Sequence, residues 1–371
     1  MKIYLVCPPL PPRLDGIGDY TALLASELAN SHTVTILTSE KNATTIPNVC
    51  IKSCFSTYNP KSYWGICDAI AEDVPDWIIL QYNPFSYGKR GMNLELPRVM
   101  DAVRKRFVGT RFALMVHEPF MPFESWKSSI MTTWQRWQLW SLGNSADVTF
   151  YSIELWRNRF QRWFPGKPAV HLPVGSNIPF SGVSREQARE HLGIPKSTLV
   201  LGFFGQAHHT RMFNSMYEAS LSLQKAGNMV QILCIGSGGD QVRSSFGDLP
   251  TIITGRLDAP DVSKHLSAID IYLSVFKDGI STRRGSMMAG IQHALPTVGT
   301  IGPYTDTLLQ RENNNAYLLS PVGDQQAFND AVLQVGAEPG LRAALSTNAA
   351  ALYEREFTWA RITNRLTAAL G

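Results

Sequence analysis

Short apolar runs alternate with segments of helical periodicity along the first half of the chain. Ile3–Cys7 is continuously apolar, as expected of a strand covered on both faces, and Tyr20–Ala29 then spaces its apolar residues as a helix does. Further strands are expected at Val34–Leu37, Trp77–Gln81, Phe112–Val116 and Val148–Tyr151, with helices near Leu96–Phe107 and over Glu124–Leu142. This alternation implies right-handed βαβ crossovers and predicts a doubly wound α/β domain with a parallel sheet.

A second set of βαβ units follows an interdomain linker. The segment Leu172–Pro179, LPVGSNIP, combines two prolines with a glycine and a serine, which is typical of a connection between domains. Beyond it we expect strands at Val200–Phe204, Gln231–Gly236, Ile252–Thr254, Ile271–Val275 and Thr297–Gly299, and helices at Ser184–Leu192, Phe213–Ala226 and Pro260–Ser267. The predicted domains are residues 1–176 and 177–353. Residues 354–371 form a C-terminal segment, in which Glu356–Leu370 is an amphipathic helix with Trp359, Ile362, Leu366 and Leu370 on one stripe.

The composition is that of an ordinary globular protein. Hydrophobic residues make up 44% and charged residues 17% of 371 residues, which argues against a disordered chain and leaves room for two cores. The net charge of +4 is small and no run of five like charges occurs, so nucleic-acid binding has little support. The five cysteines lack a CxxC pair, and we expect them to be buried, reduced thiols. No apolar run reaches membrane-spanning length, so we expect a cytoplasmic protein.

The stretch Ser274–Thr300 joins a buried strand to a helix through a polar loop. The strand is expected to end near Phe276, and the helix to begin around Gly285–Ser286. A helix N-terminus presents unpaired backbone N–H groups and the positive end of the helix dipole, which suit a phosphate. The loop between them also carries Asp278, Ser281, Thr282, Arg283 and Arg284. These features predict an anion site after this strand.

Two loops of the first domain follow predicted strands closely. In open α/β sheets, ligands bind beyond the carboxyl ends of the strands. Gly16 and Gly18 in the sequence DGIGD allow backbone to approach an anion, although a plain turn has the same composition. His117 and Glu118 directly follow the strand at Phe112–Val116. His117 either bonds a sugar hydroxyl or makes only structural hydrogen bonds.

Two loops of the second domain are comparable. Gly205–Met212, GQAHHTRM, offers Arg211 and two adjacent histidines after a strand, which suits a pyrophosphate. A metal site there is the weaker interpretation, because adjacent residues of a rigid loop rarely chelate one ion and no acidic or cysteine partner is near. Ile235–Asp240, IGSGGD, is a further glycine-bearing strand end. Together with the loop after Phe276, these segments make a converging set.

The chain resembles the retaining glycosyltransferases of the GT-B fold, in the large group numbered family 4, nearly from end to end. The resemblance rests on seven segments in the same order: DGIGDYT, VHEP, LPVGSNIP, FFGQAHHTR, LCIGSGGD, TGRLDAPDVSKHLSAIDIYLSVFKDGIS and FTWARITNRL. It implies two Rossmann-like domains that face each other across a cleft, with a C-terminal helix that returns to the N-terminal domain. The N-terminal domain would bind the acceptor and the C-terminal domain the nucleotide sugar.

The resemblance also implies roles for individual residues. Asp278 would hold sugar hydroxyls, and His117 would lie near the sugar and the acceptor. The donor diphosphate would be bound by Gly16, Gly18, Arg211, Ser281, Thr282 and Arg283. The nucleotide would contact Gly205, Gly236, Gly238, Arg256, Leu257 and Ser286. The chain departs from the family at positions that commonly carry two glutamates, here Asp278 and Ser286, and an arginine and a lysine, here Gln206 and Arg211.

These departures leave several functions open. The first is transfer of a sugar from a nucleotide diphosphate sugar to an acceptor hydroxyl, with retention and without a metal or other cofactor. The second is a catalytically silent protein that keeps the fold and binds nucleotide, which the neutral residues Gln206 and Ser286 motivate. A sugar-nucleotide epimerase is the third and has less support. Arg283 or Arg284 would replace the lost positive charge, unless these arginines are solvated surface residues.

The acceptor would be a glycan, a glycolipid or a small molecule. Residues 124–164 combine many tryptophans with arginines, namely Trp126, Trp134, Trp137, Trp140, Trp156 and Trp163 with Arg136, Arg157, Arg159 and Arg162. Such mixtures occur at membrane surfaces, so peripheral contact with the inner face of a membrane is one interpretation. Helical spacing of Trp126, Ile130, Trp134 and Trp137 makes core packing the other.

Overall fold

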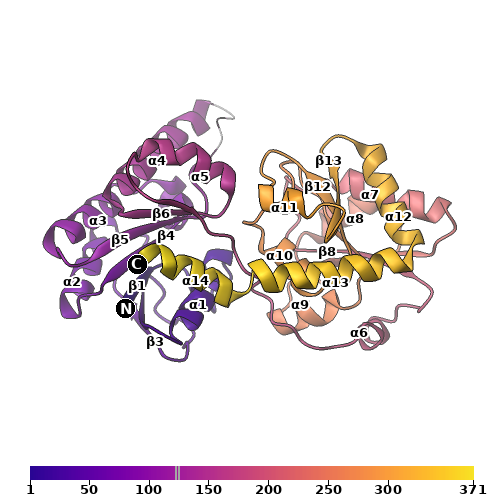
Figure 1. Cartoon of the computed structure of the whole chain (residues 1–371), viewed down its shortest axis with the longest axis horizontal. Helices are drawn as coiled ribbons and strands as arrows, with labels where there is room; N and C mark the ends of the chain where they lie inside the picture. Colours follow the sequence, from indigo (N-terminus) through magenta and orange to yellow (C-terminus); the bar gives the residue numbers. More distant parts are fainter. Residues whose placement is uncertain (122, 124–125) are drawn as a thin grey trace. The chain divides into compact units, whose positions relative to one another are not determined.

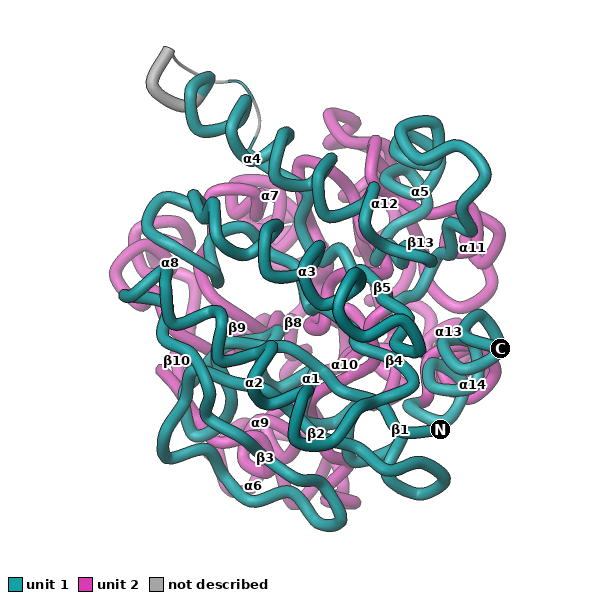
Figure 2. Tube along the Cα trace, turned by 90° about the vertical axis from the view of Figure 1, so that its left-hand side faces the viewer, with its two compact units in different colours: residues 1–173, 359–371 teal, residues 174–358 magenta. Residues whose placement is uncertain are grey.

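The computed structural model describes residues 1–121, 123 and 126–371 and divides the chain into two compact units (Figure 2). Unit 1 contains Met1–Pro173 and Trp359–Gly371, and unit 2 contains Val174–Thr358. The predicted boundaries were after residues 176 and 353. The linker joins unit 2 earlier than predicted because the Val174 N–H donates a 2.9 Å hydrogen bond to the carbonyl of Thr282.

Unit 1 is built on a parallel sheet of seven strands with the order β3-β2-β1-β4-β5-β6-β7. The strands are β1 (Lys2–Val6), β2 (Thr33–Thr38), β3 (Val49–Ser53), β4 (Trp77–Tyr82), β5 (Arg111–Val116), β6 (Val148–Tyr151) and β7 (Ala169–His171). Its helices are α1 (Gly16–Leu28), α2 (Gly65–Glu72), α3 (Glu95–Arg106), α4 (Trp126–Ser145), α5 (Glu154–Phe160) and α14 (Trp359–Leu370). The predicted start of α4, Glu124 with Ser125, lies outside the described residues.

Unit 2 contains a parallel sheet of six strands with the order β10-β9-β8-β11-β12-β13. The strands are β8 (Leu199–Phe204), β9 (Val230–Ile235), β10 (Thr251–Ile253), β11 (Ile271–Ser274), β12 (Thr297–Ile301) and β13 (Tyr317–Pro321). The helices are α6 (Arg185–His191), α7 (Phe213–Lys225), α8 (Gly239–Phe246), α9 (Ala259–Leu266), α10 (Gly285–Gln292), α11 (Thr307–Arg311), α12 (Gln325–Ala337) and α13 (Pro339–Glu356). The predicted α/β architecture of two Rossmann-like domains is confirmed.

The central strands are mostly apolar because helices cover both faces of each sheet (Figure 1). Every residue of β4 is buried, as a strand in the middle of a parallel sheet requires. In unit 2 one core lies between the sheet and α7, α8 and α12, and a second core involves α6 and α9. The cores fix the carboxyl ends of the strands, from which the candidate site loops leave.

The C-terminal helix α14 belongs to unit 1 and packs on α1. The rings of Trp359 and Tyr20 lie 5.3 Å apart, and Ile362, Leu366 and Leu370 of the predicted stripe are buried. The predicted helix Glu356–Leu370 begins later, at Trp359, because α13 extends to Glu356 and ends there. The sequence resemblance implied that the C-terminal helix returns to the first domain, and this is confirmed.

The cysteines differ in part from the expectation of buried thiols. All five are free, and Cys7, Cys67 and Cys234 are buried, whereas Cys54 is half-buried and Cys50 is exposed. Cys50 lies on β3, the edge strand of its sheet, none of whose residues is fully buried. Burial raises the pKa of the Cys7 thiol to about 12, which keeps this thiol protonated.

Candidate functional site

Each sheet reverses its strand order once, and this point selects the loops that can form a site. In unit 1 the reversal lies between β1 and β4, and in unit 2 it lies between β8 and β11. Ligands of open parallel sheets bind beyond the carboxyl ends of the strands at such a reversal. The predicted segments Asp15–Asp19, Gly205–Met212 and Lys277–Arg284 follow three of these four strands. These motifs therefore lie where the topology places a ligand.

In unit 2 the loops after β8 and β11 are joined by backbone hydrogen bonds. The Lys277 N–H donates to the Thr210 carbonyl at 2.8 Å, and the Met212 N–H donates to the Val275 carbonyl at 3.2 Å. Residues that follow two different strands thereby form one continuous surface. Backbone hydrogen bonds next to the sheet, and not side chains alone, hold these two loops in place.

Arg211 lies buried at this junction, with 6% of its surface exposed. Its Nη2 donates a 2.8 Å hydrogen bond to the Phe204 carbonyl, and its guanidinium lies 5.0 Å from the ring centroid of Phe203 and 4.8 Å from that of Phe276. Burial lowers the pKa of Arg211, yet arginine stays protonated in proteins. The loop therefore holds a desolvated positive charge at the strand end.

Asp278 forms ion pairs with two arginines of the same loop. Its Oδ1 lies 2.6 Å from Arg284 Nη2, and its Oδ2 lies 3.1 Å from Arg283 Nη2. Arg284 also lies 3.6 Å from the ring centroid of Phe276, and burial lowers its pKa to about 10. The alternative that these arginines are solvated surface residues is wrong, because their side chains are only 18% and 15% exposed.

Two residues predicted at the diphosphate are buried within the loop. Ser281 and Thr282 have no exposed surface. The Thr282 N–H and hydroxyl both donate to Asp306 Oδ2 at 2.8 Å, and its carbonyl accepts from Val174. Thr282 is therefore not available to a phosphate in this conformation. Its hydrogen bonds hold the loop in place and connect it to the first residue of the unit.

Glycines bring several more of the predicted residues of unit 2 close together. A Cβ on Gly205, at φ +112°, would lie 3.4 Å from Arg211 and 3.9 Å from Ser286, so these three residues are neighbours. A Cβ on Gly236 would lie 2.4 Å from the carbonyl oxygen of Gly205, and one on Gly238 would collide with Ala207. The strand ends of β8 and β9 can approach this closely only without side chains.

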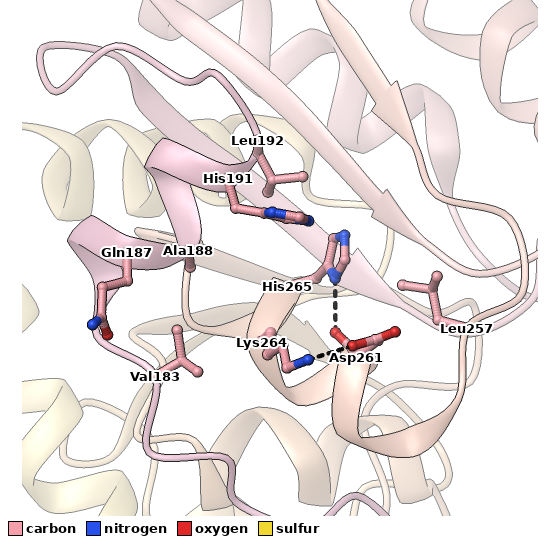
Figure 3. Close-up of a pocket in the computed structure, with 9 residues that line it drawn as sticks. All are labelled: Val183, Gln187, Ala188, His191, Leu192, Leu257, Asp261, Lys264 and His265. Carbon is pink, nitrogen blue, oxygen red and sulfur yellow. Dashed lines mark hydrogen bonds and ion pairs between the residues drawn. The ribbon is translucent and has the colours of Figure 1, made fainter.

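Arg256 and Leu257 are not brought into the Asp278 cluster by any contact in the described part of the chain. Leu257 lines a separate pocket of about 540 Å³ between α6 and α9, which also contains His191, Lys264 and His265 (Figure 3). In this pocket Asp261 forms a 2.7 Å ion pair with Lys264 and accepts a hydrogen bond at its carbonyl from His265. Arg256 is exposed. Their predicted contacts with a nucleotide stay predictions.

In unit 1, His117 lies buried at the end of β5. Its Nε2 is 2.8 Å from Gln81 Oε1, and its ring meets the Tyr20 ring edge to face at 4.8 Å. Burial lowers the pKa of His117 to about 3, so the imidazole is neutral at physiological pH. A neutral imidazole can hydrogen-bond a hydroxyl but supplies no positive charge.

The glycines of the DGIGD loop differ in their surroundings. Asp15 caps α1, accepting hydrogen bonds at Oδ1 from the N–H groups of Ile17 and Gly18. A Cβ on Gly18 would lie 2.9 Å from the Pro9 carbonyl oxygen, whereas one on Gly16 would meet nothing. The Gly18 N–H is thus used by the cap, and only Gly16 is exposed.

Buried polar atoms without a hydrogen-bond partner among the described atoms occur around both reversals. In unit 2 they include Ser274 Oγ and Ser281 Oγ, and Nε of Arg211 and of Arg284. In unit 1 they include Tyr20 Oη and Gln81 Nε2, on either side of His117. Such atoms are rare in folded proteins and each calls for a partner. Sequence reasoning missed Gln81, Tyr20 and Asp306, because only the tertiary structure shows what they contact.

The aromatic and basic residues of unit 1 form a partly exposed surface. On α4, Ile130, Trp137 and Trp140 are 62%, 41% and 51% exposed, so core packing does not explain them. The Arg136 guanidinium lies between 5.4 and 5.7 Å from the ring centroids of Phe120, Phe123 and Trp163. The other tryptophans differ: Trp156 is buried, Trp134 and Trp163 are half-buried, and the side chain of Trp126 lies outside the described residues.

Comparison with known proteins gives one relative of known activity. No family model matches the chain. A GDP-mannose-dependent monoacylated alpha-(1-6)-phosphatidylinositol monomannoside mannosyltransferase from Corynebacterium glutamicum is 24% identical over 258 residues. The match covers 64% of this chain and 65% of that protein, a little under two thirds of its length.

Solved structures match over the whole chain. The sucrose-phosphate synthase from Thermosynechococcus elongatus has a TM-score of 0.74 at 16% identity, covering 99% of this chain and 98% of that chain. Anabaena HepE in complex with UDP and glucose gives 0.72 at 12%, covering 100% and 99%. WaaG, a glycosyltransferase involved in lipopolysaccharide biosynthesis, gives 0.68 at 14%, covering 100% and 98%. The chain has the GT-B fold. At these identities the likeness establishes the fold, and the activity has to be argued from the site.

The helices of the described residues bear on a membrane span, and their side chains bear on a metal site. None of the helices there combines the length and apolarity needed to cross a bilayer. No group of three or more His, Cys, Asp or Glu side chains has an arrangement suited to a metal ion within the same residues. The expectation of metal-independent chemistry stays a prediction.

Proposed function

We propose that the protein transfers a sugar from a nucleotide diphosphate sugar to an acceptor hydroxyl, with the donor bound by unit 2. The observation that carries this proposal is the cluster of Arg211, Arg283, Arg284 and Asp278 at the strand-order reversal. Three guanidinium groups against one carboxylate leave two positive charges in excess. A diphosphate is the anionic group that a nucleotide sugar would bring to such a site.

The mechanism we propose uses fixed positive charge instead of a strong base. When the bond between the sugar and the diphosphate breaks, negative charge develops on the leaving group. Arg211, Arg284 and the N-terminus of α10 would stabilise that charge, because they are already oriented and partly desolvated. The acceptor oxygen would bond to the anomeric carbon as the diphosphate departs, and the acceptor proton would pass to a diphosphate oxygen. We propose that configuration is retained, and that this leaving-group stabilisation needs no metal ion.

Asp278 would contact the sugar hydroxyls of the donor, and His117 would act from unit 1. Asp278 accepts hydrogen bonds from two arginines, and its carboxylate would exchange one of them for a sugar hydroxyl. His117 is neutral and would contribute a hydrogen bond, with Gln81 fixing the ring. The Corynebacterium relative is described as GDP-mannose-dependent, and HepE was crystallised with UDP. Guanine and uracil nucleotides are therefore the first donors to test.

Binding of nucleoside diphosphates tests the donor site directly. UDP, GDP, ADP and TDP are compared by their effect on the unfolding temperature, because a ligand that binds the folded state raises it. We expect one or two of them to bind, and Arg283→Gln with Arg284→Gln to weaken that binding by about a hundredfold, since two charge-assisted hydrogen bonds are lost. Arg243→Gln on the exposed face of α8 is the matched control. If no diphosphate binds, or the double variant binds equally well, the donor site is wrong.

A catalytically silent nucleotide-binding protein is the second candidate. The two ion pairs of Asp278 favour it, because they engage both oxygens of the carboxylate that would hold a sugar. An activity assay distinguishes the two functions. Its substrate is the nucleotide sugar that contains the nucleoside diphosphate found to bind. Transfer or slow hydrolysis that Asp278→Ala and His117→Ala abolish supports the enzyme, and activity equal to that of both variants supports the silent protein.

We further propose that unit 1 works at an anionic membrane surface. Exposed Trp137 and Trp140 have the amphipathic rings found at lipid interfaces, and the surrounding arginines would attract anionic headgroups. The test is co-sedimentation with vesicles that contain phosphatidylglycerol, at low and high salt. Binding should fall when both tryptophans are replaced by alanine and should be unaffected by Val108→Ala, which alters an exposed apolar residue elsewhere on unit 1. Absence of binding at low salt contradicts this proposal.

A further inference from the structure

Unit 1 contains a pocket of about 770 Å³ that was not predicted from the sequence. Its wall comes from three places in the sequence, each just after a strand. The loop after β1 supplies Arg13 and Asp15, the loop after β3 supplies Tyr58, and the loop after β4 supplies Phe85 and Lys89. β1 and β4 are the two strands between which the order of the sheet reverses (Figure 1). The pocket therefore lies where a doubly wound sheet binds its ligand.

The pocket has an excess of positive charge. Arg13 and Lys89 are exposed, and neither forms an ion pair within the part of the chain that the structure describes. Asp15 is the one carboxylate among the lining residues, and its Oδ1 is taken up by two backbone N–H groups of α1. Two cations that face one partly engaged carboxylate favour a negatively charged ligand.

Aromatic side chains supply the other part of the wall. Tyr58 is 91% exposed and Phe85 is 45% exposed, although both carry large apolar rings. Exposed rings at the edge of a polar pocket are typical of ligand sites, where they cover the apolar face of a ligand ring. A sugar or cyclic polyol has such a face and also carries hydroxyl groups. The chemistry of the wall thus matches a ring with an attached anion.

The loop after β4 is held in place before any ligand binds. The Tyr87 hydroxyl donates to the carbonyl oxygens of Val6 at 2.9 Å and Gln81 at 2.8 Å, at the ends of β1 and β4. The Tyr87 carbonyl accepts from Tyr63 and from Asn93, both at 2.7 Å. Tyr87 is fully buried, so this network fixes the segment that presents Phe85 and Lys89. A preformed wall lowers the entropic cost of binding.

We propose that this pocket binds the acceptor, and that the acceptor carries a phosphate or carboxylate next to a sugar or polyol ring. Arg13 and Lys89 bind the anionic group, and Tyr58 and Phe85 contact the ring. This inference rests on the proposed glycosyl transfer, for which it specifies the acceptor class. The anion could belong to a lipid headgroup or to a water-soluble sugar, and the two sources share this chemistry.

Binding to the full-length protein without donor tests the proposal. Inositol 1-phosphate is compared with inositol, and glucuronate with glucose, by saturation-transfer NMR or calorimetry. Vesicles that contain phosphatidylinositol form the lipid arm of the experiment. We expect at least one charged probe to bind about tenfold more tightly than its neutral counterpart, because one charge-assisted contact is worth about that factor.

Variants locate the binding. Arg13→Gln with Lys89→Gln should abolish the preference for charge, and Tyr58→Ala should weaken charged and neutral probes alike. Lys41→Gln, on an exposed loop of the same unit, is the matched control. These positions are exposed, so their replacement leaves the fold intact. The proposal is supported if the wild type prefers the charged probe and the double variant does not. The kind of probe that shows this loss, soluble or lipid, identifies the source of the anion.

Other outcomes overturn the proposal. They are the absence of saturable binding by every probe at millimolar concentration, equal binding of charged and neutral probes, and charged binding that the double variant retains. Nucleoside diphosphate binding to unit 2 is measured separately on the same preparations. A protein that binds nucleotides and fails these tests keeps the proposed function and loses the acceptor class. One that binds charged probes but no nucleotide loses the proposed function, and with it the identification of the bound ring as an acceptor.

Discussion

Asp278 and Arg284 neutralise each other in the loop after β11, with Asp278 Oδ1 and Arg284 Nη2 2.6 Å apart. The carboxylate that was predicted to hold a sugar is thus the partner of an arginine suited to the diphosphate. If the proposed donor binds here, it would compete with the carboxylate for the guanidinium and free Asp278 for the sugar. Donor binding and the exposure of Asp278 would then be coupled.

Replacing Asp278 by asparagine should affect binding and turnover in opposite directions. Without the carboxylate, Arg283 and Arg284 lose their shared counter-charge, so the affinity for a nucleoside diphosphate should rise about fivefold. The rate of sugar transfer should fall by about ten- to a hundredfold, because the charged carboxylate that would accept hydrogen bonds from the sugar hydroxyls is lost. Calorimetry with the diphosphate and steady-state kinetics with the nucleotide sugar measure the two effects.

Asp248→Asn on the surface of unit 2 removes the same charge away from the loop and should change neither quantity. A parallel loss of diphosphate affinity and activity in Asp278→Asn would mean that the ion pairs support the shape of the loop and do not compete with the donor.

Gly18 and Gly16 form a matched pair for testing the DGIGD loop. Gly18→Ala places a Cβ 2.9 Å from the Pro9 carbonyl oxygen, which is backbone and cannot turn away. We expect a loss of about 1–3 kcal/mol in the free energy of unfolding, the usual cost of overpacking. Gly16→Ala meets nothing within 4 Å and should be neutral or slightly stabilising. Denaturant unfolding measures both, and equal stabilities for the two variants would contradict the close approach of the backbones.

The sequence predicted the elements that are most fully buried. β1, β4 and β8 are largely apolar runs in the centres of their sheets, and their predicted limits were right to within a residue at most ends. The edge strand β3 was missed because only one side of it pairs, so polar Lys52 and Ser53 interrupt the pattern. α13 was missed because its apolar residues are spread around the helix and give no clear stripe.

The candidate site could be located from sequence but not described. Glycines and charges after strands identified the loops, since topology alone brings strand ends together. The ties from Thr282 to Asp306 and from His117 to Gln81 depend on tertiary contacts across 24 and 36 residues, for which the sequence has no signal. The pocket around Arg13 and Lys89 was missed because its residues come from three loops and share no motif.

The buried ion pair between Arg189 and Asp270 should be important for the stability of unit 2. Arg189 is 2% exposed and also donates to the carbonyls of Thr198 and Ala268, while Asp270 accepts from the Val200 N–H at 2.7 Å. Asp270→Asn leaves the guanidinium buried without a counter-charge, and we expect a loss of about 3–5 kcal/mol.

Arg185 contacts the same carboxylate from a more exposed position, with 42% of its side chain accessible. Arg185→Gln is the control and should lose less than about 1 kcal/mol. Chemical unfolding curves give both values, and a loss of similar size in the two variants would show that burial of Arg189 does not decide the cost.

His117 should make unit 1 less stable in acid. Its pKa is about 3 in the folded protein and about 6.5 in an unfolded chain, so between these values the unfolded state binds more protons. Stability therefore falls as the pH decreases from about 6.5 toward 3. At about pH 5, which is about 1.5 pH units below the pKa in the unfolded chain, the loss in the free energy of unfolding is about 2 kcal/mol.

His117→Gln has no imidazole that could take up a proton. Between about pH 7 and pH 5, its free energy of unfolding should therefore fall by about 2 kcal/mol less than that of the wild type. Denaturant midpoints of both proteins at each pH measure this, and between about pH 7 and 8.5 their curves should run parallel. Parallel curves in the acid range as well would mean that His117 takes up its proton in the folded protein and that its burial is less complete than the structure shows.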